Sequence, residues 1–187
     1  MRFTNTLATI AMITLAGCTN TSQRTNVNVG YYNVKGTSFE QLDRQIALHG
    51  PNVKGVGKAV ASTSVRMMPD IRFKTVGDEC RVSYSRINVK ADVILPRLSD
   101  RNKAAKDLRP AFSNIERYAK LHEAVHVKIA DRYATKAEKA IANLKSEKNC
   151  AILQAKAVST FETIMKEHRA KQLQFDADEQ KRFARQT

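Results

Sequence analysis

The C-terminal half of the chain carries two long amphipathic patterns. From Ala111 onward the sequence contains neither Gly nor Pro, so nothing in its composition interrupts a helix. At 3.6 residues per turn, one apolar stripe contains Phe112, Ile115, Ala119, Ile129, Tyr133, Ala137, Ala140 and Leu144. A second stripe contains Leu153, Ala157, Val158, Phe161, Ile164, Met165, Phe175 and Phe183. Because only a short connection near residues 146–149 separates them, we expect two helices packed as an antiparallel hairpin.

The N-terminal half is richer in strand patterns. Alternating polar and apolar positions predict strands at residues 27–34, 62–76 and 80–95. Gly77-Asp78-Glu79 is typical of a hairpin turn between the last two strands. Between the first two, Ser38 precedes a short helical pattern that ends at Gly50-Pro51. These elements predict an α+β fold, in which a small antiparallel sheet is followed by a long C-terminal antiparallel helical hairpin.

The first residues have the pattern of an export signal. A basic start at Met1-Arg2 is followed by an apolar stretch over residues 7–16, which is too short for a membrane span. Leu15-Ala16-Gly17-Cys18 resembles the bacterial lipobox, in which the Cys becomes the lipid-modified N-terminus; an ordinary signal peptide with an incidental Cys is the alternative. We predict a lipoprotein signal peptide at residues 1–17, a flexible tether at 18–27 and one domain at 28–187. This domain would be anchored to the bacterial cell envelope, facing the periplasm or the exterior.

The balance of charge is strongly basic. The chain carries 32 Lys and Arg residues against 18 Asp and Glu residues, a net charge of +14. An excess of this size favours anionic partners. The basic positions are scattered over the predicted helix faces without interleaved aromatic side chains, which argues against nucleic acid as the partner. For an exported chain, the expected partners of this surface are anionic lipid or cell-wall polymer.

Export also changes the interpretation of the cysteines. If Cys18 is lipidated, Cys80 and Cys150 remain as an even pair in an oxidising compartment, where a disulfide is the default. Such a bond would close a loop of about 70 residues and stabilise the fold by roughly 4 kcal/mol. Two buried free thiols are the alternative.

The first long helical pattern contains the segment His122-Glu123-Ala124-Val125-His126. Residues four apart on a helix are rotated by about 40° and separated by about 6 Å along its axis, so both imidazoles can bind one metal ion. Zinc suits this pair because it accepts imidazole nitrogen and lowers the pKa of a bound water to about 7. Glu123 is placed to accept the proton of that water. Two core histidines bonded to carbonyls or carboxylates are the alternative.

A third ligand must come from elsewhere, because Ile129 and Arg132 stand where the longer metzincin pattern has Gly and His. Folding the hairpin about residues 148–149 places the two histidines opposite residue 173 and its neighbours. The candidates within reach are His168, Asp176 and Glu179. The last two are carboxylates on or beside an apolar stripe, for which an ion pair with an Arg is the alternative.

Several segments spread over the chain carry a resemblance to a known family. They are residues 32–51, Cys80-Arg81-Val82, Leu95-Pro96-Arg97, the segment 121–127 around the two histidines, Cys150 and Phe175-Asp176-Ala177-Asp178-Glu179. With them the chain resembles a family of bacterial envelope proteins, catalogued as a domain of unknown function and described as predicted secreted zinc-dependent proteases. The resemblance implies a zincin-like fold, zinc bound by His122 and His126, and Glu123 as general base. Many members continue with Thr-x-His-Gly where this chain has residues 179–182, so Glu179 or Asp176 would complete the site.

Two hypotheses for the function follow. The first is an envelope-anchored zinc metallopeptidase, in which Glu123 takes a proton from the attacking water and passes it to the leaving amine. Its polypeptide substrate would pair with a strand in the region 80–95, and Tyr118 and Tyr133 would be packing residues near the histidines. The second is a non-catalytic periplasmic lipoprotein with a structural metal or a buried-histidine core and a basic partner-binding surface.

Overall fold

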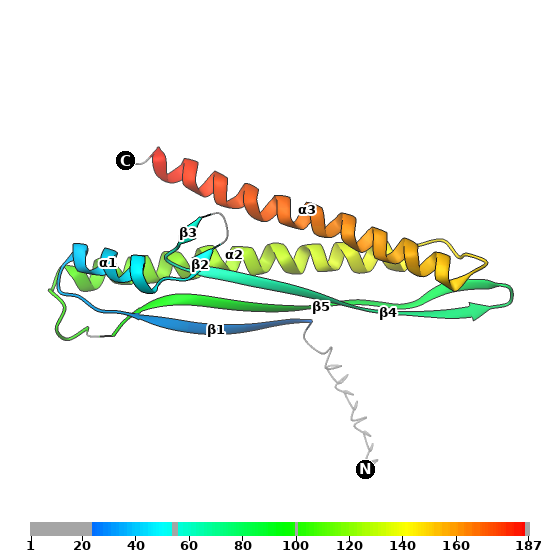
Figure 1. The fold of residues 1–187 in the computed structure, drawn as a ribbon, viewed down its shortest axis with the longest axis horizontal. Helices are drawn as coiled ribbons and strands as arrows, with labels where there is room; N and C mark the ends of the chain where they lie inside the picture. The colour runs from blue at the N-terminus through cyan, green and yellow to red at the C-terminus, as the bar shows by residue number, and fades with distance from the viewer. Residues whose placement is uncertain (1–23, 54–55, 100, 186–187) are drawn as a thin grey trace, which may run out of the picture.

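The computed structural model describes residues 24–53, 56–99 and 101–185 (Figure 1). The predicted signal peptide and the lipidation site Cys18 lie outside these ranges. The elements are β1 (Thr25–Val34), α1 (Phe39–His49), β2 (Asn52–Val53), β3 (Gly57–Lys58), β4 (Ser62–Val76), β5 (Glu79–Leu98), α2 (Leu108–Ala142) and α3 (Cys150–Ala184). The predicted α+β class and the C-terminal helical hairpin are confirmed.

The main sheet has three strands in the order β1-β5-β4. A turn at Gly77, whose φ of 60° suits a residue without a side chain, joins β4 to β5 as an antiparallel ribbon. β1 pairs with the other side of β5 in parallel, from Thr25 opposite Val89 to Val34 opposite Leu98. The sheet is therefore mixed, and the predicted all-antiparallel sheet is wrong at β1. The reason is the long connection through α1, β2, β3 and β4, which returns the chain in the direction of β1.

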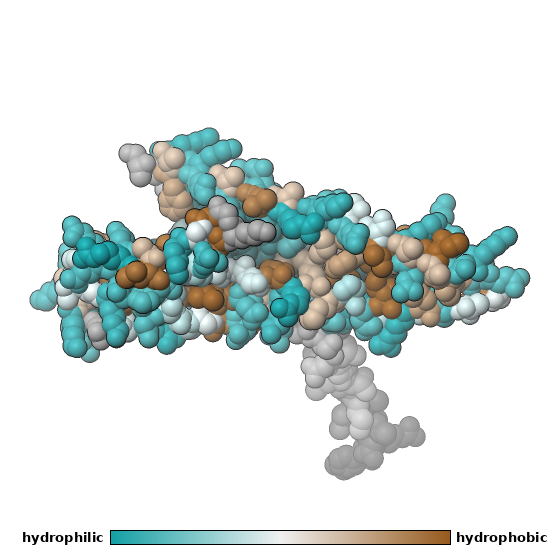
Figure 2. Space-filling view, in the orientation of Figure 1, coloured by the Kyte–Doolittle hydropathy of each residue, from teal (hydrophilic) through white to brown (hydrophobic). Residues whose placement is uncertain are grey.

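The core lies between β5 and α2. Alternate residues of β5 point toward the helix layer and are buried, namely Ile87, Val89, Ala91, Val93 and Leu95. The facing stripe of α2 contains the small side chains Ala130, Ala134 and Ala137, which let the helix lie close to the sheet. Figure 1 shows α3 running along α2 and diverging from it toward the C-terminus. On the face shown in Figure 2, hydrophilic side chains dominate and the apolar patches are small and separate.

Hydrogen bonds at the start of β1 fasten it to α2. The guanidinium of Arg24 donates to Asp131 Oδ1 at 2.7 Å and to Glu138 Oε2 at 2.8 Å. The Thr25 hydroxyl donates to the same Asp131 oxygen at 2.7 Å, and Glu138 Oε1 accepts from the backbone N–H of Ile87 at 2.8 Å. Because of these bonds the strand begins at Thr25, so residues 25–27 of the predicted tether belong to the sheet.

A disulfide joins the start of β5 to the start of α3. Cys80 and Cys150 are bonded with their Cα atoms 5.1 Å apart, so this prediction is confirmed. Backbone bonds in both directions between Cys80 and Glu147 hold the interhelix connection against the same strand. Together they fix where α3 begins and therefore which of its residues lie opposite α2. In the part of the chain that the structure describes, no helix has the length and apolarity to cross a bilayer.

We predict that loss of the disulfide lowers the free energy of unfolding by roughly 4 kcal/mol, because it closes a loop of 70 residues. Urea unfolding of the wild type with and without reductant measures this difference. The double variant Cys80→Ser/Cys150→Ser should match the reduced wild type and be insensitive to reductant. An oxidised wild type with the stability of the double variant would contradict the prediction.

We predict that Asp131→Asn lowers the free energy of unfolding at neutral pH by about 1 kcal/mol. Burial alone would raise the pKa of Asp131, but bonds from Thr25 and Arg24 outweigh it and hold this pKa below its ordinary value. A pKa that is lower in the folded state gives stability that is present above about pH 4 and lost as the pH falls through the folded-state pKa.

Urea unfolding across this range measures the effect, with the exposed carboxylate of Asp43 as the matched control. Asp131→Asn should differ from the wild type at neutral pH and converge with it in acid, while Asp43→Asn should match the wild type throughout. A difference that persists unchanged in acid would show that the carboxylate charge is not responsible.

Candidate metal centre

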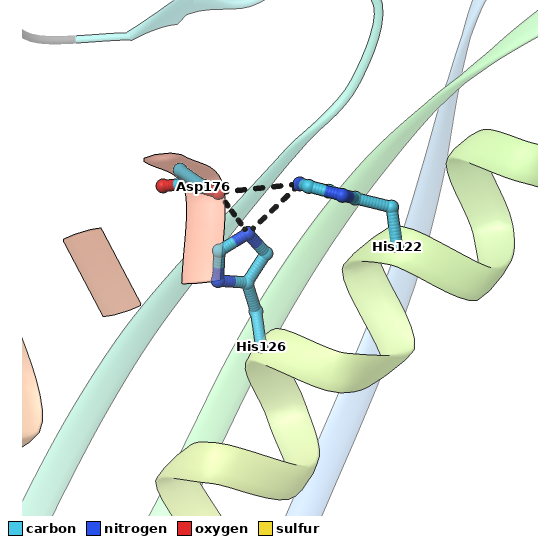
Figure 3. A group of neighbouring side chains, drawn as sticks. All are labelled: His122, His126 and Asp176. Carbon is cyan, nitrogen blue, oxygen red and sulfur yellow. Dashed lines mark hydrogen bonds and ion pairs between the residues drawn. The ribbon is translucent and has the colours of Figure 1, made fainter. Parts of the chain in front are cut away.

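α2 carries His122 and His126 one turn apart, on the side that faces α3 (Figure 3). Their Nε2 atoms are 3.1 Å apart and their ring centroids 4.9 Å apart. Phe175 of α3 packs against both rings, with centroid distances of 4.7 and 5.1 Å. The helical spacing of four residues and the aromatic ring across the interface therefore direct both imidazoles to one point.

Asp176 of α3 lies opposite this pair. Its Oδ1 atom is 3.3 Å from Nε2 of His122 and 3.0 Å from Nε2 of His126, as the dashed lines of Figure 3 show. The three atoms lie within 4.8 Å of one another, which places them around one common point. Two imidazole nitrogens and one carboxylate oxygen are a donor set that a divalent transition metal accepts.

The remaining nitrogen of His126 is held by Gln172. Gln172 donates from Nε2 to the backbone carbonyl of His126 at 3.1 Å, which can only accept and so fixes the orientation of the amide. Its Oε1 therefore accepts from Nδ1 of His126 at 2.7 Å. Nδ1 of His126 therefore carries a proton, and in the neutral ring Nε2 presents a lone pair toward Asp176 and His122. This is the tautomer that a metal ligand requires.

His168, a candidate third ligand, lies behind Gln172 and not beside the imidazole pair. Its Nε2 accepts a hydrogen bond of 2.9 Å from the Gln172 amide. Burial lowers the pKa of His168, with further lowering from Arg169 and His126, so the ring is neutral and able to accept. Tyr133 packs edge-on against it with centroids 5.7 Å apart, in the predicted packing role. His168 thus acts on His126 through Gln172.

Glu179, the other predicted carboxylate, lies on the far side of His122. It accepts hydrogen bonds of 2.7 Å from the Tyr118 hydroxyl and from Arg182, and both lower its pKa. Burial and the nearby Glu179 raise the pKa of Tyr118 to about 12, so its hydroxyl stays protonated. This hydroxyl is 3.5 Å from Nδ1 of His122, whose distance to Glu179 is 3.9 Å. Glu179 thus has an Arg partner, which is the alternative expected from the sequence for a carboxylate beside an apolar stripe. Tyr118 does more than pack, because its hydroxyl donates to Glu179.

Glu123 points from α2 toward the start of β4. Its side chain is 4% exposed, and its Oε2 atom accepts a hydrogen bond of 2.7 Å from the Thr63 hydroxyl. Within the described residues, the other carboxylate oxygen of Glu123 has no hydrogen-bond partner. The sequence did not predict Thr63 or Gln172, because each acts through a contact between segments that are distant in the chain. A polar residue facing the helix layer from a strand was the one available signal for Thr63.

These groups line a single cleft of about 440 Å³ between α2, α3 and the segment that leads into β4. Its polar floor contains the imidazole pair, Glu123 and Asp176. Its apolar walls are formed by Val53, Val56, Ala59, Ala61, Val65 and Phe183. Beside the cleft, residues 89–94 of β5 are paired with β1 on one side and with β4 on the other, so this part of the region 80–95 has no free edge to which a substrate could add. β4 is the strand whose edge borders the cleft.

Comparison with known proteins identifies the family of this chain. No curated protein and no solved structure matches the chain. The family described as "Bacterial protein of unknown function (DUF922)" matches residues 29–183, a range that contains the whole candidate metal centre, all of α2 and all of α3 but its last residue. The match confirms that the family resemblance seen in the sequence extends over most of the domain. The chain therefore belongs to DUF922, a bacterial family of unknown function.

Proposed function

We propose that this protein is a zinc-dependent metallopeptidase of the bacterial cell envelope, which hydrolyses peptide bonds of a polypeptide substrate. The observation that carries the proposal is the convergence of two imidazole nitrogens and the Asp176 carboxylate in the same cleft as Glu123. Three electron-pair donors that converge at such short distances repel one another, and a divalent cation bound between them would remove this cost. Nitrogen and oxygen donors in this number, with an open side toward the cleft, suit catalytic zinc.

The chemistry expected of the site is activation of water. When bound, Zn²⁺ would polarise the scissile carbonyl and lower the pKa of a water molecule. Glu123 is the residue placed to accept the proton of the attacking water and to deliver it to the leaving amine. The Thr63 hydroxyl occupies one oxygen of this carboxylate and leaves the other available to accept a proton. General base catalysis of this kind contributes about 10²- to 10⁴-fold in rate.

Further residues position the imidazoles. Gln172 fixes the ring of His126, and the amide is itself oriented by neutral His168. Tyr118 and Glu179 lie beside Nδ1 of His122 in the corresponding place. His126 thus has an acceptor behind it, as metal-binding histidines generally do, and His122 has the Tyr118 oxygen 3.5 Å from its Nδ1. This supports a metal as the function of the pair.

The cleft has features that suit an extended polypeptide. Its apolar walls can receive an apolar side chain, and the edge of β4 at residues 62–65 runs along its border. An extended segment can add to such an edge through main-chain hydrogen bonds. We therefore assign substrate pairing to this part of β4.

An envelope location fits the covalent chemistry of the chain. The disulfide between Cys80 and Cys150 needs an oxidising compartment, and the family is bacterial. Together with the export signal in the sequence, this supports a lipid anchor at Cys18 that holds the domain at a membrane. The basic surface would then lie close to anionic lipid or cell-wall polymer.

We predict that Glu123→Gln keeps the bound zinc and lowers the rate of peptide cleavage by about 10²- to 10⁴-fold, because it removes the base and not a ligand. Metal analysis of the purified protein, and cleavage of an unstructured protein followed by mass spectrometry, measure the two properties. His126→Ala should lose both the metal and the cleavage.

The same pair of variants distinguishes the peptidase from the non-catalytic alternative. In a protein whose metal is only structural, Glu123→Gln would change no function while loss of a histidine would destabilise the fold. Unfolding of His126→Ala, followed by circular dichroism, therefore belongs with the metal analysis. Zinc bound without cleavage of any peptide would overturn the peptidase and leave the metal site.

We predict that Asp176→Asn weakens zinc binding more than about 100-fold, whereas Glu179→Gln weakens it about 10-fold. Asp176 Oδ1 faces both Nε2 atoms, while Glu179 reaches the site only through Tyr118 and the outer nitrogen of His122. Both substitutions preserve size and remove one charge, so each is the control for the other. Competition with a chromophoric chelator measures the affinities, and the reverse order would make Glu179 the ligand.

A further inference from the structure

β1 is an edge strand without the protection that edge strands usually carry. It spans ten residues, and its sequence, TNVNVGYYNV, contains no charged residue and no Pro. In the described part of the chain, no strand pairs with its outer edge. The other edge strand, β4, contains Arg66, Pro69, Asp70, Arg72 and Lys74, the residue types that prevent unwanted pairing. The edge of β4 is therefore protected over residues 66–74, beyond the segment 62–65 at the cleft, whereas β1 has no such residue along its whole length.

The open edge is lined by apolar side chains. Val27, Val29 and Tyr31 occupy alternate positions on one face of β1 and are 46%, 44% and 51% exposed. A row of three such groups along ten residues of strand has no role in the core. Hollows beside it place Val27 next to Ala124 and Lys128 of α2, and Tyr31 next to Lys120. The outer edge of β1 and this side of α2 thus form one continuous surface.

Cations flank this surface. The Arg97 guanidinium lies over the Tyr31 ring, 3.9 Å from its centroid. Lys120 and Lys128 are exposed, and within the described ranges neither forms an ion pair. The acidic groups of the same region are already occupied. Glu116 is bonded to Arg101 and to a backbone N–H, and Asp131 is bonded to Arg24 and Thr25.

We propose that the outer edge of β1 binds an extended acidic segment of a partner polypeptide, which adds to the sheet as a fourth strand. Main-chain hydrogen bonds would hold the segment to β1, apolar side chains would cover Val27, Val29 and Tyr31, and acidic side chains would meet Lys120 and Lys128. Residues 1–23 of this chain contain no Asp or Glu, so they lack this complement. A second copy paired through β1 would set the same cations against each other.

This surface is separate from the metal centre. The cleft is lined by residues of α3 and of the segment leading into β4, whereas the β1 surface involves neither. Binding at β1 therefore does not require the proposed peptidase activity, and loss of either property leaves the other testable.

The test uses the purified chain and a synthetic peptide of alternating Val and Glu residues, with a Val–Lys peptide of equal length as control. Fluorescence anisotropy should show the Val–Glu peptide bound at least about tenfold more tightly. Val29→Glu should weaken this binding at least about tenfold. Met68→Glu is the matched control, because Met68 is also 44% exposed and lies on the protected edge strand. It should bind the peptide like the wild type.

Hydrogen exchange gives the second measurement. Peptide binding should slow amide exchange in β1 and leave β4 unchanged. If Val29→Glu and Met68→Glu lose peptide binding equally, the added negative charge alone explains the loss, and the proposal is overturned. A dimer that dissociates in Val29→Glu would also overturn the proposal, because the occupant of the β1 edge would then be a second copy of the chain. So would binding to anionic vesicles that depends on Val29 while peptide binding does not.

Discussion

Three electron-pair donors face one another across the interface of α2 and α3, and the rest of the domain has to hold them in this arrangement. Nε2 of His122, Nε2 of His126 and Oδ1 of Asp176 all lie within 4.8 Å of one another. Lone pairs at such distances repel unless a proton or a cation lies between them. The proton of His126 is held on its other nitrogen by Gln172, so this ring supplies none. The constraint on the fold is to hold these groups together despite that repulsion.

The scaffold supplies the required rigidity from outside the site. The alanine stripe of α2 lies close against β5, and the Arg24 network fastens the same helix to the start of β1. The disulfide fixes the start of α3 at Cys150, so the hairpin cannot shift its register. Asp176 therefore lies opposite the histidines because of a bond more than twenty residues away in the same helix. The disulfide and the ion pairs thus position the side chains of the site through the helices that carry them, although neither contact lies in the site itself.

Much of the fold and of the candidate site could be predicted from the sequence, and each feature that could not be predicted has an identifiable physical reason. Helical periodicity gave the hairpin, and rise per residue gave the neighbourhood of residue 173 opposite the histidines. Axial distance does not separate Asp176 from Glu179, because the two differ by only about 4.5 Å along the axis and by about 60° around it. That rotation decides which one faces the imidazoles, and it depends on side-chain packing at Phe175. The alternation of polar and apolar residues likewise predicts a strand at β1 but not its direction relative to β5. The long connection between the two strands makes them parallel.

The chemistry and the charge of this protein belong to different sides of one helix. The cleft side of α2 presents His122 and Glu123 next to the carboxylates of Asp176 and Glu179, and Arg182 is paired with Glu179. The unpaired cations Lys120 and Lys128 lie on the β1 side, beside an open strand edge. The surface proposed for a partner and the cleft proposed for bond hydrolysis therefore lie on different sides of α2, and the free lysines are kept apart from the carboxylates of the metal centre.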